Sequence, residues 1–168
     1  MSSSAHSPTS SPPRRSPEEQ ARLDAALTEI YEQRIRFNAL LGHRVTSLQA
    51  GAACIRFEMR SELVGHYLYG RLHGGVISAT LDAMGSLALM VALAEKHADE
   101  SCDQVLHRFG RMGTIDLRVD YLRPGVGAFF EATAEVTRLG GRVGSTQMRL
   151  TSDQGTLVAT GAASYVVS

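Results

Sequence analysis

The sequence predicts an α+β fold in which one antiparallel sheet wraps around a single long helix. Residues 74–96 are apolar almost all round, which is typical of a helix buried on every side. Two segments with strand character precede them and four follow, separated by turns rich in glycine and proline. One buried helix among antiparallel strands is best covered by a sheet that curls around it.

The length and composition favour one soluble domain. A chain of 168 residues can bury an adequate core without a metal or disulfide. The formal net charge is zero, which argues against a nucleic-acid partner. Cys54 and Cys102 have no metal-binding spacing, so we expect reduced thiols and no metal site. Residues 76–94 are interrupted by Asp82 and small polar residues, so we expect no membrane span and a cytoplasmic protein.

The N-terminal segment divides into a tail and a helix. Residues 1–17 are rich in Ser, Pro and Arg and lack the apolar run of a signal peptide, so we predict a disordered tail. The single domain is then predicted to span residues 18–168. Ser16 and Pro17 are typical of a helix start, and an apolar stripe continues to about Leu41. This pattern predicts an extra helix before the sheet.

The remaining elements follow from alternation and turn residues. We expect a loop over residues 61–72 and an irregular insert over residues 97–111, with a short helix at its end. The last strands are expected to follow one another as an antiparallel meander. The predicted strands cover residues 44–49, 53–60, 114–121, 129–139, 143–151 and 156–167.

A glycine pair opens the long helix. Gly74 and Gly75 lie where backbone N–H groups lack partners within the helix, and glycine allows a ligand to approach them closely. The helix dipole adds positive potential at this end. A carbonyl oxygen placed there would be polarised and a developing oxyanion stabilised. The alternative is a glycine-rich turn that only allows tight packing.

Asp82 is the second candidate for chemistry. A carboxylate in the middle of an apolar helix is costly unless it is paired or used. Ser78, Asp82 and Ser86 are spaced four residues apart, so they lie on one face of the helix. Asp82 is suited to attack a carbonyl or to activate a water molecule, and the sequence leaves both roles open. A structural ion pair with a buried Arg or His is the alternative.

These residues carry a resemblance to a known family. The run His73-Gly74-Gly75, with Asp82 nine residues after the His, resembles the signature of hotdog-fold acyl-CoA thioesterases of the phenylacetyl-CoA and second 4-hydroxybenzoyl-CoA type. Residues 120–125 also resemble the end of that family's third strand. The likeness covers residues 43–167, and it implies a hotdog fold and hydrolysis of acyl-CoA to a free acid and CoA.

The resemblance implies roles for further residues. Ser86 and Thr114 match hydroxyl positions that support the acid or the water, and His73 matches a residue that shapes the turn. Relatives often carry Asn or Gln six residues before this His, where the present chain has Tyr67 preceded by His66. Either side chain would have to substitute, or this part of the site works differently. The family's sites are built between subunits.

Helix geometry leads independently to a shared site. Gly74 and Asp82 are eight residues apart, or about 12 Å along a helix, whereas reacting atoms must approach to about 3.5 Å. Asp82 therefore cannot readily attack a carbonyl held at its own helix start. An antiparallel partner helix in a homodimer would bring the two groups together at two symmetric sites. We expect a dimer or a dimer of dimers.

The substrate would need separate contacts for its two halves. Arg123, Arg138 and Arg142 flank turns and are candidates for binding the CoA phosphates. CoA would be part of the substrate, and no other cofactor is expected. A medium-chain, long-chain or aromatic acyl group would be lined by Leu68, Tyr69, Met84 and Leu87, with Phe109 and the insert covering its end.

Two other functions are compatible with this fold. A hotdog hydratase or dehydratase would need a catalytic His in a different turn, whereas His73 is followed by two glycines. An acyl-CoA sensor would bind the ligand without turnover, and Asp82 would then have no purpose. Double-bond formation without thiol release, or tight binding without hydrolysis, would distinguish these functions from the thioesterase.

Overall fold

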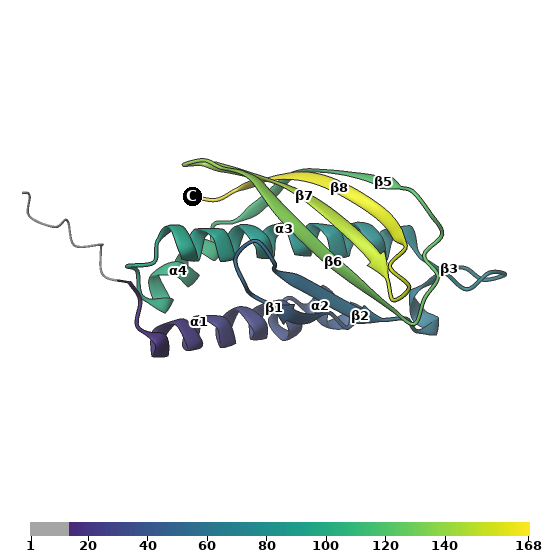
Figure 1. Ribbon diagram of the computed structural model, residues 1–168, viewed down its shortest axis with the longest axis horizontal. Coiled ribbons are helices and arrows are strands. Elements are labelled where there is room, and N and C mark those ends of the chain that lie inside the picture. Colours follow the sequence, from purple (N-terminus) through teal and green to yellow (C-terminus); the bar gives the residue numbers. More distant parts are fainter. Residues whose placement is uncertain (1–13) are drawn as a thin grey trace, which may run out of the picture.

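The computed structural model describes residues 14–168, in which a six-stranded antiparallel sheet curls around the long helix α3 (Gly74–Lys96) (Figure 1). The strand order is β1-β2-β6-β7-β8-β5. The strands are β1 (Arg44–Ser47), β2 (Cys54–Glu58), β5 (Gly113–Tyr121), β6 (Phe129–Leu139), β7 (Val143–Ser152) and β8 (Leu157–Val166). The α+β class and the wrapped sheet agree with the sequence prediction.

The position of β5 differs from the predicted meander. Only β6, β7 and β8 follow one another, because β5 pairs with β8 and lies at the edge of the sheet. After β5, the chain passes through Pro124 and Gly125 and does not pair β5 with β6. In the sheet, β8 and β7 lie between these two strands. The edge of β5 that faces away from β8 has no neighbouring strand in the described part of the chain.

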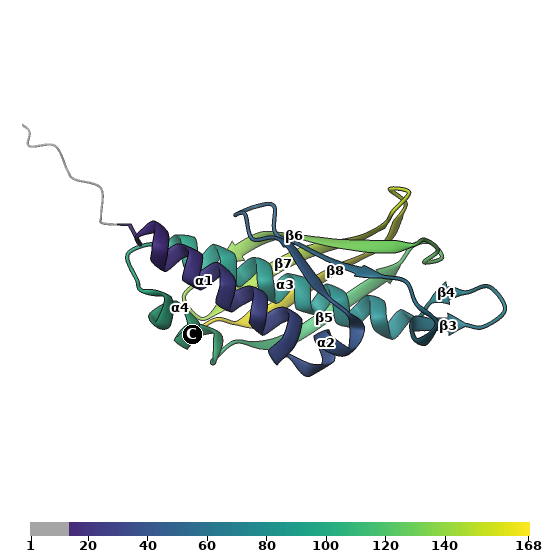
Figure 2. The same cartoon turned by 90° about the horizontal axis from the view of Figure 1, so that it is seen from below.

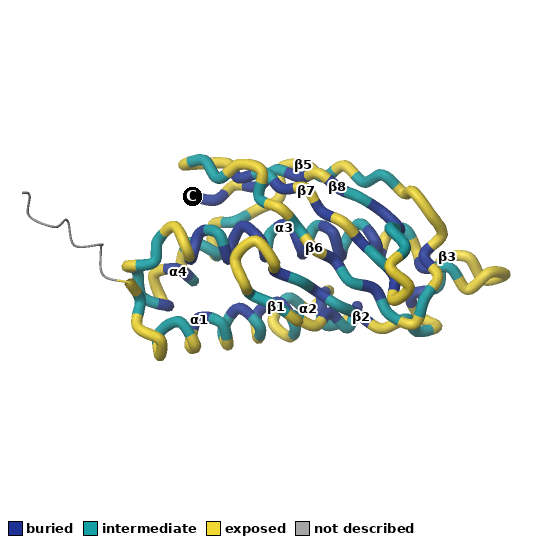
Figure 3. The backbone as a smooth tube through the Cα atoms, in the orientation of Figure 1, coloured by how far each residue is buried: buried dark blue, intermediate teal, exposed yellow. Residues whose placement is uncertain are grey.

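Helix α3 forms the centre of the core. Most of its residues are buried, and 72% of its most apolar window lies inside the protein, although its length and composition alone would allow it to cross a membrane (Figure 3). In its N-terminal half, the positions that are not buried are Gly74, Gly75, Ser78, Ala79, Asp82 and Ser86. The predicted polar face of this helix, with Ser78, Asp82 and Ser86, is therefore its less buried face.

The N-terminal helix is interrupted, contrary to the prediction of one continuous helix. It consists of α1 (Pro17–Glu29), the π-helical turn η1 (Ile30–Arg34) and α2 (Arg36–Leu41). Ile35 is extended, with φ −75° and ψ 95°, so α2 leaves in a new direction (Figure 2). Ile30 and Tyr31 in the π turn are both buried. The apolar stripe continues through the break, so the sequence did not reveal it.

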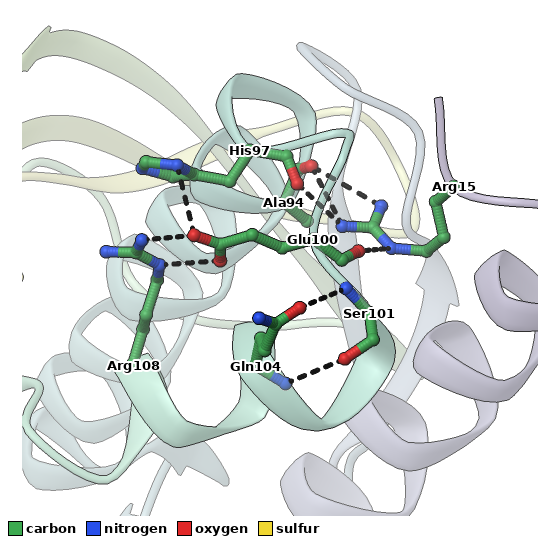
Figure 4. Close-up of polar contacts among 7 residues, drawn as sticks. All are labelled: Arg15, Ala94, His97, Glu100, Ser101, Gln104 and Arg108. Atoms are coloured by element: carbon green, nitrogen blue, oxygen red, sulfur yellow. Dashed lines mark hydrogen bonds and ion pairs between the residues drawn. The ribbon is translucent and has the colours of Figure 1, made fainter. Parts of the chain in front are cut away.

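The predicted tail over residues 1–17 lies outside the described residues except for its last four. Of these, Arg15 is bound to the C-terminal end of α3 (Figure 4). Its guanidinium donates to the carbonyl oxygens of His97 at 3.0 Å and Glu100 at 2.9 Å. Exposed carbonyls at a helix end favour such a cation. The folded part therefore begins before the predicted boundary at residue 18.

The insert over residues 97–111 packs against this same end. Its helix α4 (Cys102–Phe109) is capped by Ser101 and buries Cys102 and Val105. The Phe109 ring contacts the Tyr31 ring edge-on, with centroids 5.7 Å apart. The insert thus covers the C-terminal end of α3 in its own chain, and the glycine pair lies at the opposite end.

The predicted loop before α3 contains a small hairpin. After a short 3-10 turn η2 (Ser61–Leu63), strand β3 (Val64–His66) pairs with β4 (Arg71–Leu72), and the tip projects beyond the sheet (Figure 1). Gly65 permits this pairing, because a Cβ atom there would lie 2.7 Å from the Cα of His73. The second strand of the hairpin ends at Leu72, and α3 begins two residues later at Gly74.

A buried histidine, which follows α2 in the chain, contacts helix α3. His43 is 1% exposed, and its Nε2 lies 2.9 Å from the Thr80 hydroxyl. That hydroxyl donates to the Val76 carbonyl, so it accepts from the Nε2–H of His43. The Nδ1 atom then carries no proton, and it has no partner in the described residues. Burial lowers the pKa of His43 from 6.5 to about 4.

We expect His43 to make the protein sensitive to acid. The unfolded chain takes up a proton as the pH falls below 6.5, whereas the folded chain resists it down to about pH 4, so stability falls across that window. The protonation of His43 should therefore lower the free energy of unfolding by about 2 kcal/mol at pH 5 relative to pH 7.5. Urea unfolding of wild type and His43→Gln at both pH values measures it. An equal pH dependence in the two proteins would contradict this account.

Candidate active site

His73 caps the start of α3. Its Nδ1 accepts the Gly75 N–H at 2.8 Å, and its carbonyl oxygen accepts the N–H groups of Val76 and Ile77. Among the described residues, the Gly74 N–H has no partner. The sequence predicted that both glycine amides were open, whereas in this chain the imidazole occupies one of them. A carbonyl oxygen that bound Gly75 would take the place of the His73 ring.

The space around the glycine pair is narrow. A Cβ atom on Gly75 would lie 2.9 Å from His73 Nδ1, and one on Gly74 would lie 3.3 Å from the Tyr121 ring. The Tyr121 hydroxyl donates to the Gly74 carbonyl at 3.1 Å, so strand β5 fixes the helix start. Sequence reasoning gave Tyr121 no role in the site. The sequence did contain one indication of such a role, because Tyr121 lies in the segment 120–125 that resembles the end of the family's third strand.

Asp82 is half-buried and held by a hydroxyl. Thr114 on β5 donates to its Oδ1 at 2.9 Å, as the family resemblance implied. No Lys, Arg or His among residues 14–168 forms an ion pair with it. The structural ion pair considered from the sequence is therefore absent from the described part of the chain. One carboxylate oxygen is oriented, and no hydrogen bond within residues 14–168 occupies the other.

A tyrosine that sequence reasoning missed fixes the backbone of Asp82. The buried Tyr165 hydroxyl on β8 donates to the Asp82 carbonyl at 3.0 Å. Gly85 makes room for it, because a Cβ atom there would lie 2.3 Å from the tyrosine oxygen. Burial, together with the Asp82 charge, raises the pKa of Tyr165, so the hydroxyl keeps its proton. A single Tyr in a strand gave no sequence signal for this contact.

Ser86 is engaged on the other side. Its hydroxyl donates to the Ala83 carbonyl at 2.9 Å and lies 2.9 Å from the buried Tyr31 hydroxyl. Burial raises the pKa of Tyr31, so this phenol also stays protonated and donates to Ser86. The resemblance implied that Ser86 supports Asp82, but the two side chains form no hydrogen bond within the described residues of one chain. Ser86 instead ties the open face of α3 to the N-terminal helix.

Asp82 and the glycine pair are separate in one chain. Tyr121 contacts Gly74 and Thr114 contacts Asp82, and these two residues lie near opposite ends of β5. The groups are also about 12 Å apart along α3. Neither Asp82 nor the glycine pair is fully buried, but one protomer does not bring them together.

A hollow of about 310 Å³ adjoins the helix start. Arg123, one of the predicted CoA-binding residues, lines it, together with Arg71, which sequence reasoning missed. The turn that carries Arg138 and Arg142 lies elsewhere, because the adjoining Gly144 contacts Leu89 in the C-terminal half of α3. In one chain, only the first of the three predicted arginines lies near the glycine pair.

The residues predicted to line an acyl pocket separate into two groups. Met84 and Leu87 are fully buried core residues and line neither of the two hollows beside the helix start, so that prediction was wrong for the single chain. Leu68 and Tyr69 are exposed at the hairpin tip, as is Tyr67, whose side chain is 86% exposed. Their apolar surfaces point away from the core of their own subunit.

The described residues contain no cluster of metal ligands. No group of three or more His, Cys, Asp or Glu among residues 14–168 is placed to hold an ion. Cys54 and Cys102 are free thiols, and burial raises the pKa of both, so they are poor nucleophiles at neutral pH. The groups suited to chemistry are thus the helix-start amides, His73 and the Asp82 carboxylate.

We expect Thr114 to orient Asp82 for reaction. Thr114→Val keeps the shape but removes a hydrogen bond to a charged group, a loss of about 1.5–3 kcal/mol, or roughly 10- to 150-fold in kcat. Thr114→Ser keeps the hydroxyl and should retain most of the rate. Steady-state kinetics should show this as a fall in kcat with little change in KM. Equal activity of the Val and Ser variants would remove Thr114 from the site.

The fold and this site define a class of protein. A sheet curled around one helix, with an amide-rich helix start and a mid-helix carboxylate on the same open face, is the arrangement of a hotdog-fold thioester hydrolase. The sequence model of the family described as the thioesterase superfamily matches residues 69–159. The chain belongs to this family, which confirms the resemblance predicted from its motifs.

Two relatives match nearly the whole chain. The medium/long-chain acyl-CoA thioesterase YigI of Escherichia coli is 35% identical over 139 residues, which are 83% of this chain and 90% of the relative. The crystal structure of a Shewanella oneidensis protein related to the thioesterase superfamily has a TM-score of 0.85 and 34% identity, and the match covers 92% of this chain and 100% of that one.

A more distant structure supports the fold alone. The E. coli PaaI protein, from the phenylacetic acid degradation operon, has a TM-score of 0.67 at 19% identity. Its match covers 90% of this chain and 94% of that one. The hotdog arrangement therefore persists where little of the sequence does.

Proposed function

We propose that the protein hydrolyses medium-chain, long-chain or aromatic acyl-CoA in the cytoplasm to a free acid and CoA. The helix start at Gly74 and Gly75 polarises the thioester carbonyl, and Asp82 supplies the attacking oxygen or activates the attacking water. The observation that carries the proposal is the pairing of a capped glycine helix start with a carboxylate held by Thr114. The name of the E. coli relative supports acyl-CoA as the substrate class.

The site is completed by a second copy of the chain. Strand β5 lies at the edge of the sheet, and its Ile115 and Tyr121 side chains are 53% and 56% exposed. A long edge strand with exposed apolar residues favours pairing with another chain. Antiparallel pairing about a two-fold axis would also bring the open faces of the two α3 helices together. Asp82 of the partner subunit would then face the glycine pair.

The same assembly supplies contacts for CoA. Arg71 and Arg123 lie in the hollow beside the glycine pair and are suited to its phosphates. Arg138 and Arg142 lie toward the other end of α3, which an antiparallel dimer turns toward the partner's helix start. The exposed hairpin tip with Tyr67 would lie over the neighbouring subunit. CoA enters as part of the substrate and leaves as a product, so we propose no separate cofactor.

Thiol release from a panel of acyl-CoAs tests the proposed function. We expect turnover of acyl groups with eight or more carbons or an aromatic ring, with two symmetric sites in each dimer. Tight acyl-CoA binding without thiol release would instead indicate a sensor. After a single turnover in ¹⁸O-labelled water, label in the Asp82 carboxylate would establish nucleophilic attack, because a carboxylate that only activates water cannot acquire it.

A further inference from the structure

A second hollow lies on the other side of the helix start. It has a volume of about 400 Å³, within the range of small-molecule sites. His73 and Gly75 form one end of it, so it is continuous with the proposed reaction centre. Its apolar lining consists of Phe37, Leu40, Leu41, Leu63, Val64 and Val76, and we call it the α2 groove. Arg60 and Glu62 complete its wall.

The break before α2 creates this groove. Because Ile35 is extended, α2 does not continue the line of α1, and it lies beside the start of α3 instead (Figure 2). Phe37 and Leu40 are three residues apart on one face of α2, and they remain 56% and 65% exposed. Arg60 donates to the Leu40 carbonyl and fixes the end of α2. The helix thus presents two large apolar side chains to a space that ends at Gly75.

We infer that the α2 groove binds the acyl chain of the thioester, and that Phe37 and Leu40 determine its preferred length. This inference rests on the proposed function. A carbonyl held at the helix start has the arginine-lined hollow on one side and the α2 groove on the other. The phosphates of CoA match the first and a hydrocarbon matches the second. The apolar lining gives each buried methylene a favourable transfer from water.

The site differs from the acyl pocket predicted from the sequence. Met84 and Leu87 are filled core positions, so no chain enters there in the single protomer. The α2 groove instead uses the N-terminal segment, which lies outside the region matched by the family model. Phe37 and Leu40, which would determine the acyl-length preference, therefore come from a different part of the chain than Asp82 and the glycine pair.

A chain-length series tests this inference. The variants are Leu40→Asp and Phe37→Asp, which place a carboxylate in the groove at exposed positions where folding should be unaffected. Ala25→Asp, at an exposed position on α1 that does not line the α2 groove, is the matched control. The probes are butanoyl-, octanoyl- and dodecanoyl-CoA, each measured as kcat/KM. Light scattering on the same samples reports the oligomeric state.

In wild type, kcat/KM should rise about fourfold for each methylene that the groove buries, until substrate encounter limits the rate. Both groove variants should lose at least about tenfold with dodecanoyl-CoA and less than about twofold with butanoyl-CoA, while the control behaves as wild type. An unchanged length profile in the variants, or loss of the dimer, would overturn the inference while leaving the proposed function intact. Absence of thiol release by wild type would refute the proposed function itself.

Discussion

Asp82→Asn is expected to lower kcat by about 10²- to 10⁴-fold, the range that a positioned carboxylate contributes to proton transfer or attack. The amide has the shape of the carboxylate, and its oxygen can still accept the Thr114 hydroxyl, which lies 2.9 Å from Asp82 Oδ1. The variant therefore removes the charge and nucleophilicity while leaving the contact to β5 in place. Steady-state kinetics with the best acyl-CoA measures the effect.

The control for Asp82→Asn is its stability. Because the carboxylate is half-buried without an ion pair in residues 14–168, its neutral replacement should leave the urea midpoint unchanged or slightly raised. A folded variant with wild-type kcat would show that Asp82 is a structural residue. If the variant lost both its activity and its folded structure, Asp82 would have a role in stability that its observed contacts do not explain.

Gly75→Ala is expected to lower kcat by about 10²- to 10³-fold, because blocking access to the amide should have the same effect as losing one oxyanion donor. The new methyl group would lie 2.9 Å from His73 Nδ1, so it displaces the ring that caps the helix. It would also occupy the space through which a carbonyl oxygen reaches the amide. The same kinetic assay measures this loss, and circular dichroism checks that the helix is retained.

Gly141→Ala provides the matched control for Gly75→Ala. A Cβ atom at Gly141 meets no other atom within 4 Å, and the residue lies in the turn between β6 and β7. This variant should keep wild-type kinetics with every acyl-CoA. If Gly75→Ala were as active as Gly141→Ala, the helix start would have no part in carbonyl activation.

The sequence predicted the elements whose patterns are local. The bounds of α3 and β6 agree with the prediction, because a long apolar run and an alternating strand are both patterns of residues that are neighbours in the sequence. The break at Ile35 was missed because no glycine or proline marks it and the apolar stripe continues through the π turn. The pairing of β5 with β8 was missed because strand order depends on long-range contacts that the turn residues do not determine.

In the candidate site, too, features that depend on local sequence were predicted and features that depend on long-range contacts were not. Gly75 and Asp82 were proposed from their types and spacing, and Thr114, which contacts Asp82, from the family resemblance. Tyr165 and Tyr31 were not found, because each acts through one hydroxyl that folding brings to α3 from a distant element. Met84 and Leu87 were assigned to an acyl pocket, and the structure instead buries both in the core, because core and pocket residues have the same apolar character in a sequence.

The most direct test of the shared site uses a heterodimer made of one Asp82→Asn chain and one Gly75→Ala chain, purified through two different affinity tags. Each parental homodimer carries one defect in both of its sites. In the heterodimer, one site combines the intact helix start of the first chain with the intact Asp82 of the second. We expect its kcat per dimer to recover to about half the wild-type value, since one of two symmetric sites is whole. A heterodimer as inactive as both parents would show that each site lies within a single chain.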